Sequence, residues 1–267
     1  MNTGLNDLDA TIDINGDKLI VLGSRPAMGK SILALNIISN IAIKQNEAVL
    51  YFNLEISKEQ IASRFISSNS MVKYNKLRKL RDPKIEGEEL TDDDWYRIAY
   101  GTELFKKSKI FIDDKAYISI DEICIEARKM KLEQNIQFIV IDYLQLIKYE
   151  GDKCLSRDLQ IKEILKKLKI LSKELNIPVL VLSQLSRKTE EREEHRPILT
   201  DFSNSMSSIC ACSDIVLLLY RDEYYNADTK LKNIAEIIIA KGSLEGKTIE
   251  TAWMPEYLKF GNLLRIK

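Results

Sequence analysis

The sequence has few residues of the kinds that bind zinc or form disulfide bonds. It contains one histidine and four cysteines among 267 residues. The cysteines form no C-x-x-C pair, and His195 lies beside Arg196 in a charged stretch, so we expect neither a zinc site nor a disulfide framework. The cysteines are Cys124, Cys154, Cys210 and Cys212.

Long apolar segments and net charge are also lacking. No apolar run approaches the roughly 20 residues of a membrane span, and the N-terminus lacks the basic-then-apolar order of a signal peptide. We therefore expect a cytoplasmic protein without membrane contact. Forty basic residues balance forty acidic ones. A global positive field is excluded, so any nucleic-acid contact must come from a local patch.

What is present is an alternation of short apolar strands and amphipathic helices. The length suits one large domain or two small ones. Strands followed by helices predict a mostly parallel sheet covered on both faces, and later strands without long helices between them predict an antiparallel extension. The first strands are expected at 18–22, 48–53, 110–113, 138–142 and 179–183, and the later ones at 215–220, 235–240 and 248–253.

Helix starts are indicated by capping residues. Residues 31–44 and 162–175 have apolar residues at helical spacing. Ser57, Thr91 or Asp92, and Ser119 are each placed to open a helix, Ser57 and Ser119 with capping-box spacing. Residues 70–108 are predicted to be a charged helical insertion without chemistry of its own.

Residues 18–31 have the strand–loop–helix order that a phosphate-binding loop requires. In such a loop, backbone N–H groups and the positive end of the helix face the phosphates. Lys30 would reach the β- and γ-phosphates, and the Ser31 hydroxyl would bind Mg²⁺. One departure is that the first glycine of G-x-x-x-x-G-K-[ST] falls at Ser24, with Gly23 one place too early. A plain strand–turn–helix connection is the alternative.

Polar residues end three of the predicted strands. Because parallel strands deliver their C-terminal ends to one edge of the sheet, we expect Glu55, Asp142 and Gln184 beside Lys30. Asp142 follows four apolar residues, as a Walker B carboxylate that holds Mg²⁺ does. Glu55 is placed to polarise an attacking water, and Gln184 to sense the γ-phosphate. For any one of them alone, a solvated polar residue at a strand end is the alternative.

Six segments together resemble the successive motifs of the C-terminal ATPase domain of DnaB-type replicative helicases. The segments are Ser24-Arg-Pro-Ala-Met-Gly-Lys-Ser31, Leu54-Glu-Ile-Ser57, Ile141-Asp-Tyr-Leu-Gln-Leu146, Leu182-Ser-Gln-Leu-Ser-Arg187, Tyr220-Arg-Asp-Glu223 and Ala235-Glu-Ile-Ile-Ile-Ala-Lys241. The resemblance runs from about Thr3 to Phe260, and the string at 141–146 is specific to that family among RecA-like ATPases.

The resemblance implies a single RecA-like ATPase domain over residues 1–267, with ATP and Mg²⁺ as cofactors. It also implies a ring-shaped hexamer with ATP at subunit boundaries, movement along single-stranded DNA, and a primase or loader as partner. Glu55 would be the catalytic base, Gln184 would couple hydrolysis to DNA loops, and Lys30 and Lys241 would act on the phosphates. The expected nucleotide-binding residues are Ser24, Arg25, Pro26, Ala27, Met28, Gly29, Lys30, Ser31, Arg64 and Asp142, of which Ser31 and Asp142 hold the metal.

Two segments depart from the family pattern. Where the family continues Lys241 with Gln-Arg-Asn-Gly, this chain has Gly-Ser-Leu, so the arginine finger falls on Ser243. Losing such a finger removes about 10³ to 10⁵ in rate, and a lysine lacks the planar fork of arginine. The DNA-contacting loop at 202–212 carries no charge, which lowers the electrostatic share of DNA affinity. Local contacts with single-stranded DNA are expected at 202–212 and near 151–158. Lys166, Lys167 and Lys169 are interpreted as a solvated helix face.

The family's helical N-terminal domain and linker helix have no counterpart in this sequence, so we expect weakened rings from either an excised domain or a short homologue. The first hypothesis is an ATP-dependent helicase motor. The second is an ATP-binding relative that regulates a replication complex, which Ser243 and the uncharged loop favour. The third is a RecA- or KaiC-like ATPase outside replication.

Overall fold

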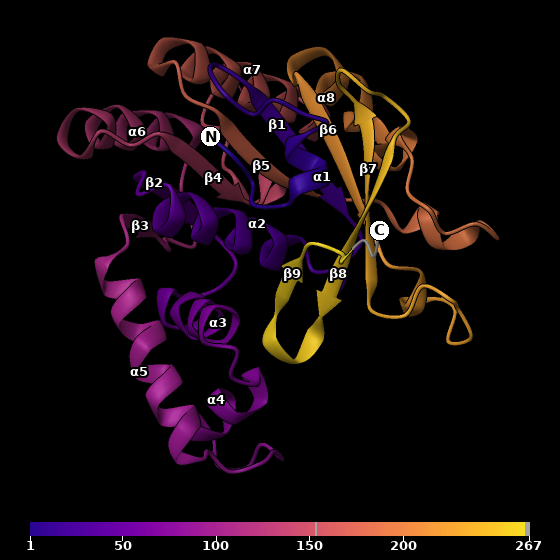
Figure 1. Cartoon of the computed structure of the whole chain (residues 1–267). Coiled ribbons are helices and arrows are strands. Elements are labelled where there is room, and N and C mark those ends of the chain that lie inside the picture. Colours follow the sequence, from indigo (N-terminus) through magenta and orange to yellow (C-terminus); the bar gives the residue numbers. More distant parts are fainter. Residues whose placement is uncertain (153, 265–267) are drawn as a thin grey trace.

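A nine-stranded sheet with helices on both faces forms the centre of the structure, a computed structural model that describes residues 1–152 and 154–264 (Figure 1). The strands are β1 (Leu19–Ser24), β2 (Val49–Asn53), β3 (Ile110–Asp113), β4 (Phe138–Asp142), β5 (Val179–Gln184), β6 (Ile215–Tyr220), β7 (Ile234–Lys241), β8 (Thr248–Met254) and β9 (Lys259–Gly261). The α-helices are α1 (Asn6–Asp9), α2 (Lys30–Ser39), α3 (Lys58–Ser70), α4 (Tyr74–Arg81), α5 (Asp92–Lys107), α6 (Ile120–Gln134), α7 (Arg157–Leu175) and α8 (Met206–Cys212).

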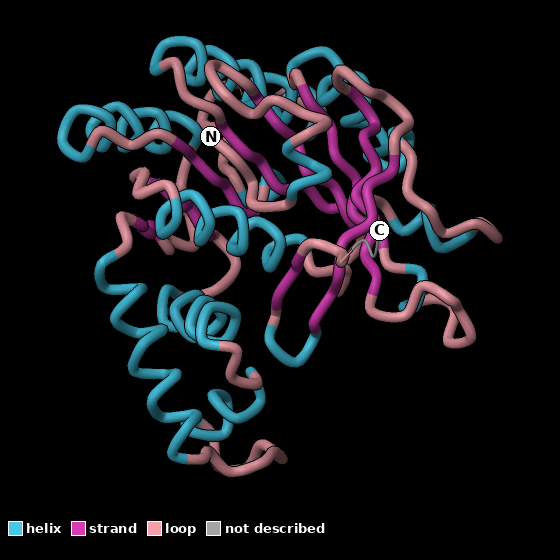
Figure 2. Tube along the Cα trace, in the orientation of Figure 1, coloured by secondary structure: helices cyan, strands magenta, loops and turns pink. Residues whose placement is uncertain are grey.

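The strand order is β3-β2-β4-β5-β1-β6-β7-β8-β9. The strands from β3 to β6 in this order pair in parallel, and β7, β8 and β9 pair antiparallel. The predicted α/β fold, with its parallel sheet and antiparallel C-terminal extension, is therefore confirmed. Figure 2 shows the strands fanned across the middle of the molecule with helices on either side.

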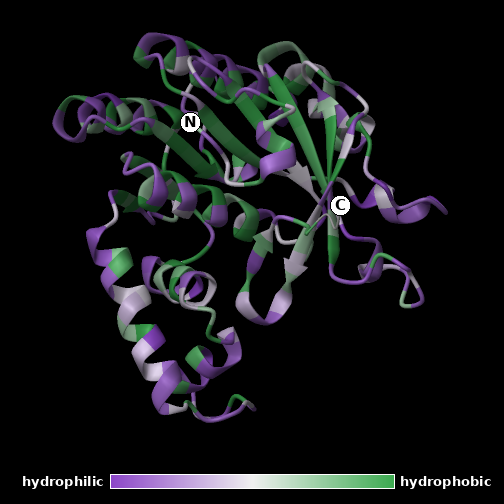
Figure 3. Ribbon diagram, in the orientation of Figure 1, coloured by the Kyte–Doolittle hydropathy of each residue, from purple (hydrophilic) through white to green (hydrophobic). Residues whose placement is uncertain are grey.

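Alternating side chains of the central strands fill two apolar layers. On β1, Ile20 and Leu22 pack into the layer beneath α2, and Leu19 and Val21 pack into the layer beneath α6 and α7. Burial on both faces explains why these strands are continuous apolar runs in the sequence. Figure 3 shows the same division, with central strands mostly green and outer helix surfaces mostly purple.

The predicted helix starts differ in how they are capped. Ser119 forms a reciprocal capping box at the start of α6, as its spacing predicts, and Thr91, one of two residues expected to open α5, forms a second one that was not predicted. Ser57 is the N-cap of α3, but its side chain accepts no capping hydrogen bond, so the expected capping box is wrong. The carboxylate of Asp114 accepts from the backbone N–H of Lys58 at 2.9 Å and satisfies that end of the helix instead.

Three segments depart from the predicted elements. The helix expected over 31–44 is α-helical to Ser39 and continues as a π-helical turn over Asn40–Lys44. The segment 202–212, expected as a loop, is mostly helical, because Phe202 and Ile209 are buried in the same apolar layer as α7 and bring a short 3₁₀ helix (Leu199–Ser205) and α8 against it. Strand β9 was not predicted.

The charged insertion at 70–108 is helical, as predicted, and lies with α3 beside one end of the sheet (Figure 1). Phe105 of α5 packs against Phe65 of α3 with ring centroids 4.8 Å apart. Among residues 1–152 and 154–264, none of the helices combines the length and the hydrophobicity needed to span a bilayer.

Candidate nucleotide site

The loop between β1 and α2 turns sharply to place the start of α2 at the C-terminal edge of the parallel strands. Ala27 and Gly29 have φ angles of 65° and 98°, in the left-handed region. A Cβ atom on Gly29 would lie 3.0 Å from Cζ of Phe260, and this tight contact together with the positive φ favours glycine there. The N-terminus of α2, where Lys30 and Ser31 lie, thus faces the cavity with the unpaired N–H groups that bind phosphate.

Two arginines, one in the loop and one after the neighbouring strand β6, tie this loop to the rest of the sheet edge. The Arg25 guanidinium donates to the backbone carbonyl of Leu185 at 2.8 Å and to Glu190 at 2.7 and 3.0 Å. Arg221 donates to the carbonyl of Ala27 at 2.8 Å. Arg25 lines the cavity, as predicted, but its guanidinium forms an ion pair with Glu190.

A cavity of about 420 Å³ lies against this loop. It brings together residues predicted from five separate segments: Ser24, Arg25, Pro26, Ala27, Gly29, Lys30, Ser31, Glu55, Arg64, Asp142 and Gln184. Met28 does not line it, because its side chain is buried in the core, 1 % exposed. The sequence reasoning missed the apolar and aromatic lining, which comprises Ile32, Ile56, Tyr74, Tyr143, Trp253 and Leu258.

Lys30 and Asp142 form a buried ion pair at the floor of the cavity. Lys30 Nζ lies 3.6 Å from Asp142 Oδ1 and 4.9 Å from the ring centroid of Tyr143. Burial lowers the pKa of Lys30, and the carboxylates of Asp142 and Glu55 oppose that shift. A phosphate chain would supply the negative charge that a buried ammonium needs.

The same carboxylate fits a magnesium ion. Asp142 is fully buried, and its Oδ1 has no hydrogen-bond partner among the residues that the structure describes. Apart from the Lys30 ammonium at 3.6 Å, this buried carboxylate oxygen is free to accept a further cation or donor. With the Ser31 hydroxyl on the same cavity, the oxygen ligands that Mg²⁺ prefers beside nucleotide phosphates are in place.

A hydrogen-bonded chain on β2 connects Asp142 to the turn that carries Glu55. The Tyr51 hydroxyl donates to Asp142 Oδ2 at 3.2 Å and accepts from Asn53 Nδ2 at 2.6 Å. Asn53 Oδ1 accepts from the backbone N–H groups of Glu55 and Ile56 at 3.1 and 2.8 Å. Burial, and next the negative charge of Asp142, raise the pKa of Tyr51 well above its usual value. The phenol therefore keeps its proton and remains a hydrogen-bond donor.

Gln145 holds the end of β5 at the cavity. Its amide donates to the Ser183 hydroxyl at 2.9 Å and to the Gln184 carbonyl at 3.2 Å, and its oxygen accepts from the Gln184 N–H at 3.2 Å. These bonds position Gln184 at the cavity, where it was predicted. The glutamine in the string at 141–146 was the available signal for this role.

Lys241 lies away from this cavity. Strand β7 is antiparallel to β6, so its last residue falls at the opposite edge of the sheet from Lys30. There Lys241 Nζ donates to the backbone carbonyls of Cys210 and Ser213 at 2.5 and 2.6 Å, at the C-terminal end of α8. Within one chain, Lys241 and Lys30 therefore cannot act on the same phosphate.

The lysines of α7 are not uniformly solvated. Lys166 and Lys167 pair with Glu163 at 2.7 Å and with Asp121 at 2.5 Å on the outer surface, as a solvated helix face predicts. Lys169 differs, because its ammonium lies 2.8 Å from Asp214 in a half-buried pair. The segment near 151–158 contains Lys153, which lies outside the described residues.

A phosphate-type loop opening a helix, with a carboxylate at the end of a parallel strand opposite it, places the chain in the class of RecA-like P-loop ATPase domains. The family model described as the DnaB-like helicase C terminal domain matches residues 1–262. The chain belongs to that family.

Known relatives agree with this assignment. The chain is 40% identical to the replicative DNA helicase DnaB of Geobacillus stearothermophilus and 39% identical to the replicative DNA helicase DnaC of Bacillus subtilis, covering 98% of this chain and 56% of each relative. It therefore spans little more than half the length of these relatives.

Solved structures of the same family superpose on the chain. A DnaB-like replicative helicase, whose structure was described together with its interactions with primase, matches with a TM-score of 0.91 and 31% identity, over 98% of this chain and 62% of that one. A second solved structure, described as an ATPase domain, matches with a TM-score of 0.89 and 31% identity, over 98% of this chain and 91% of that one.

Proposed function

We propose that residues 1–267 form the ATPase motor domain of a DnaB-type replicative helicase, which hydrolyses ATP to move on single-stranded DNA and unwind duplex. The observation that carries the proposal is the cavity at the C-terminal sheet edge. There the ion pair of Lys30 with Asp142, whose Oδ1 accepts no hydrogen bond from the described residues, meets the start of α2, with Glu55 on the same cavity. Membership of the family supports the same function.

Each residue of the cavity has a role in this proposal. Lys30 binds the β- and γ-phosphates, and Ser31 and Asp142 hold Mg²⁺, which neutralises phosphate charge when bound. Glu55 orients a water molecule and accepts its proton during attack on the γ-phosphorus. Gln184 senses the γ-phosphate. Arg64, whose Nε is buried without a hydrogen-bond partner among the described residues, contacts the nucleotide.

The cavity also has an apolar and aromatic lining, which this proposal assigns to the nucleobase. Trp253 and Leu258 line it together with Tyr74. Trp253 packs against Phe260 with centroids 4.6 Å apart, and the Arg221 guanidinium lies 5.0 Å from the Trp253 ring centroid. Such aromatic and aliphatic surfaces suit a flat base, while the polar groups of the cavity take the phosphates.

The motor functions as a hexameric ring in this proposal. Copies assemble head to tail, so that Lys241 of one copy meets the nucleotide of the next. Single-stranded DNA contacts the segments 202–212 and 151–158, and a primase or loader is the expected further partner. The placement of Lys241 at the edge opposite Lys30 supports this arrangement, because a trans role requires separation of the two within each chain.

A second candidate function is a nucleotide-binding regulator that turns over slowly. It is favoured by Ser243 at the arginine-finger position and by Lys241, whose ammonium is engaged with carbonyls of α8. The two candidates share the nucleotide cavity. They differ in whether single-stranded DNA accelerates hydrolysis.

The test compares the parent chain with Lys30→Ala, Glu55→Gln and the exposed control Lys106→Gln. We expect Lys30→Ala to lose ATP binding, and Glu55→Gln to bind ATP normally but lose turnover by about 10²-fold or more. Stimulation of the parent by an oligo-dT strand identifies the motor, and ATP binding without stimulation identifies the regulator. Parental turnover in Glu55→Gln would refute the assigned base.

A further inference from the structure

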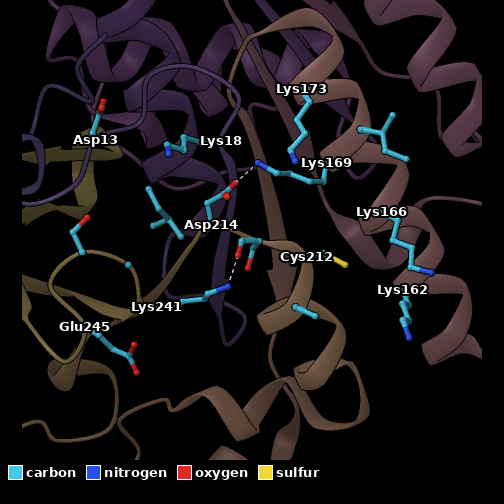
Figure 4. Close-up of a pocket in the computed structure, with 16 residues that line it drawn as sticks. Asp13, Lys18, Lys162, Lys166, Lys169, Lys173, Cys212, Asp214, Lys241 and Glu245 are labelled. Carbon is cyan, nitrogen blue, oxygen red and sulfur yellow. Dashed lines mark hydrogen bonds and ion pairs between the residues drawn. The ribbon is translucent and has the colours of Figure 1, made fainter.

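A second cavity lies at the opposite edge of the sheet from the nucleotide site. Its volume is about 1150 Å³, and it lies where β1 and β6 begin and β7 ends. Six lysines from three parts of the chain line it, namely Lys18, Lys162, Lys166, Lys169, Lys173 and Lys241 (Figure 4). We call this cavity the lysine basin.

Half of these ammonium groups are already engaged. Lys169 pairs with Asp214 at 2.8 Å and Asp17 at 3.6 Å, and Lys241 donates to two carbonyls. Lys166 pairs with Glu163. Three carboxylates line the basin against its six lysines, and one of them, Asp214, is neutralised by Lys169.

The other three lysines, Lys18, Lys162 and Lys173, form no ion pair and no side-chain hydrogen bond within residues 1–152 and 154–264. Lys18 still interacts at longer range with the carboxylates of Asp13 and Asp214. Lys18 directly precedes β1 and the other two come from α7; Figure 4 shows Lys18 near Asp214, Lys173 near Lys169, and Lys162 farther along the helix. Unpaired like charges around one concave surface attract a multiply charged anion.

A solvated helix face explains only part of this arrangement. Positions 162, 166, 169 and 173 lie on one face of α7, whose opposite face is buried in the core through Leu165 and Leu168. That periodicity would place lysines outward in any case. It does not account for Lys18, which converges on the same cavity from the strand that leads to the phosphate loop.

The chemistry of the basin favours phosphate over other anions and over a DNA strand. Lysine binds phosphate as a point charge, and the basin lacks the arginine fork that matches a planar carboxylate. Sites for single strands combine cations with aromatic rings on which bases stack. The apolar side chains that line the basin are aliphatic, from Ile170, Ala211 and Ile215.

We propose that the lysine basin binds the polyphosphate chain of a nucleotide through Lys18, Lys162 and Lys173, as a second phosphate site at the sheet edge opposite Lys30. The phosphates have two possible sources, a free nucleotide or the nucleotide held by a second copy of the chain. The second source rests on the proposed function. In that case the basin lysines of one copy would supply the positive charge that Ser243 lacks at the arginine-finger position. The first source does not depend on it.

The primary test uses inorganic tripolyphosphate as the probe and Lys30→Ala as the background, so that the phosphate loop does not contribute. The basin pair is the double variant Lys18→Gln with Lys173→Gln. The control pair, Lys106→Gln with Lys230→Gln, removes the same charge from exposed positions elsewhere. By calorimetric titration we expect the basin pair to weaken binding about tenfold or more, and the control pair to stay within about twofold. Lys162→Gln is an independent second variant.

Equal affinities in the basin and control pairs would overturn the proposal, provided that their thermal midpoints match. It would also be overturned if the basin pair lost affinity for an oligo-dT strand but not for tripolyphosphate. Because this test needs no hydrolysis, it can succeed where the proposed ATPase fails.

The source of the phosphates is then identified with ATP. Binding of two equivalents of a non-hydrolysable ATP analogue by a monomeric parent chain, with one lost in the basin pair, identifies free nucleotide. The alternative source is tested by mixing two variants. Lys30→Ala chains keep the basin, and basin-pair chains keep the phosphate loop. If mixing them restores ATP turnover, the basin binds the nucleotide held by a second copy of the chain. If neither is seen, the basin does not serve a nucleotide and the proposal fails.

Discussion

Replacing Asn53 with alanine tests whether the hydrogen-bonded chain on β2 positions the proposed catalytic base. Asn53 is fully buried and makes three side-chain hydrogen bonds, one to the Tyr51 hydroxyl and two from the N–H groups of Glu55 and Ile56. At about 0.5 to 1.5 kcal/mol net for each bond, Asn53→Ala should lower the free energy of unfolding by about 2 to 4 kcal/mol. The thermal midpoint should fall by roughly 5 to 15 °C.

The same substitution should lower turnover more than nucleotide affinity. Without the Asn53 acceptor, the turn that carries Glu55 is free to shift, and a displacement of about 1 Å at a catalytic group can cost about 10²-fold in rate. The phosphate loop is untouched, so binding of an ATP analogue should stay near parental. Steady-state kinetics and calorimetric titration below the melting transition measure the two quantities separately.

Tyr51→Phe is the matched comparison. It keeps the ring in the core and the Asn53 Oδ1 bonds to the turn, but it removes the donor to Asp142 Oδ2 and the acceptor for Asn53 Nδ2. We expect it to raise the Mg²⁺ requirement by about 10- to 100-fold with a smaller effect on turnover at saturating Mg²⁺. Parental turnover and stability in Asn53→Ala, or the same pattern of loss in both variants, would refute the separate roles of these two residues.

Other features of the structure give further expectations. Asp142→Asn should raise the Mg²⁺ concentration needed for half-maximal turnover by at least about tenfold, measured by Mg²⁺ titration, because a carboxylate ligand is lost. Gln145→Ala should reduce stimulation of turnover by oligo-dT several-fold while ATP affinity is kept, because Gln184 loses its anchors; unchanged stimulation would exclude this positioning role. The hydrogen bond from Lys76, and next the backbone N–H of Thr91, lower the pKa of Asp94 to about 2. A lowered carboxyl pKa stabilises the fold above its unfolded value of 3.8, and that stability is lost as the pH falls from 3.8 towards 2. Asp94→Ala should therefore lower the free energy of unfolding, measured with urea at pH 6, by about 1 kcal/mol. The difference in this free energy between the variant and the parent should shrink as the pH approaches 2.

The elements that the sequence predicts best are those whose signal is local. Strands β2, β4 and β6 are unbroken apolar runs, and the Ser119 and Thr91 capping boxes are set by residues three apart. The edge rule for parallel strands then brings Glu55, Asp142 and Gln184 to one cavity without any contact information. These inferences need only the strand ends and their order.

The features that the sequence could not give depend on contacts between distant segments. Tyr51 and Asn53 occur within a buried strand, where nothing local indicates that they bond to Asp142 and to the Glu55 turn. The same holds for Arg221, which reaches back to Ala27. The segment 202–212 was expected to be a loop from the resemblance alone, although its apolar residues bury against α7 and make it helical.

Support of the phosphate loop by the last strands affects how the chain can mature during synthesis. Gly29 packs beneath Phe260 and Trp253, and Asn6 and Gly4 are tied to Asn262 by hydrogen bonds of 2.7 and 3.0 Å. The ribosome releases the loop long before the rings that shape it. A nascent chain stalled before Trp253 should thus be unable to retain nucleotide, which makes ligand capture a marker that β8 and β9 have been made and have paired.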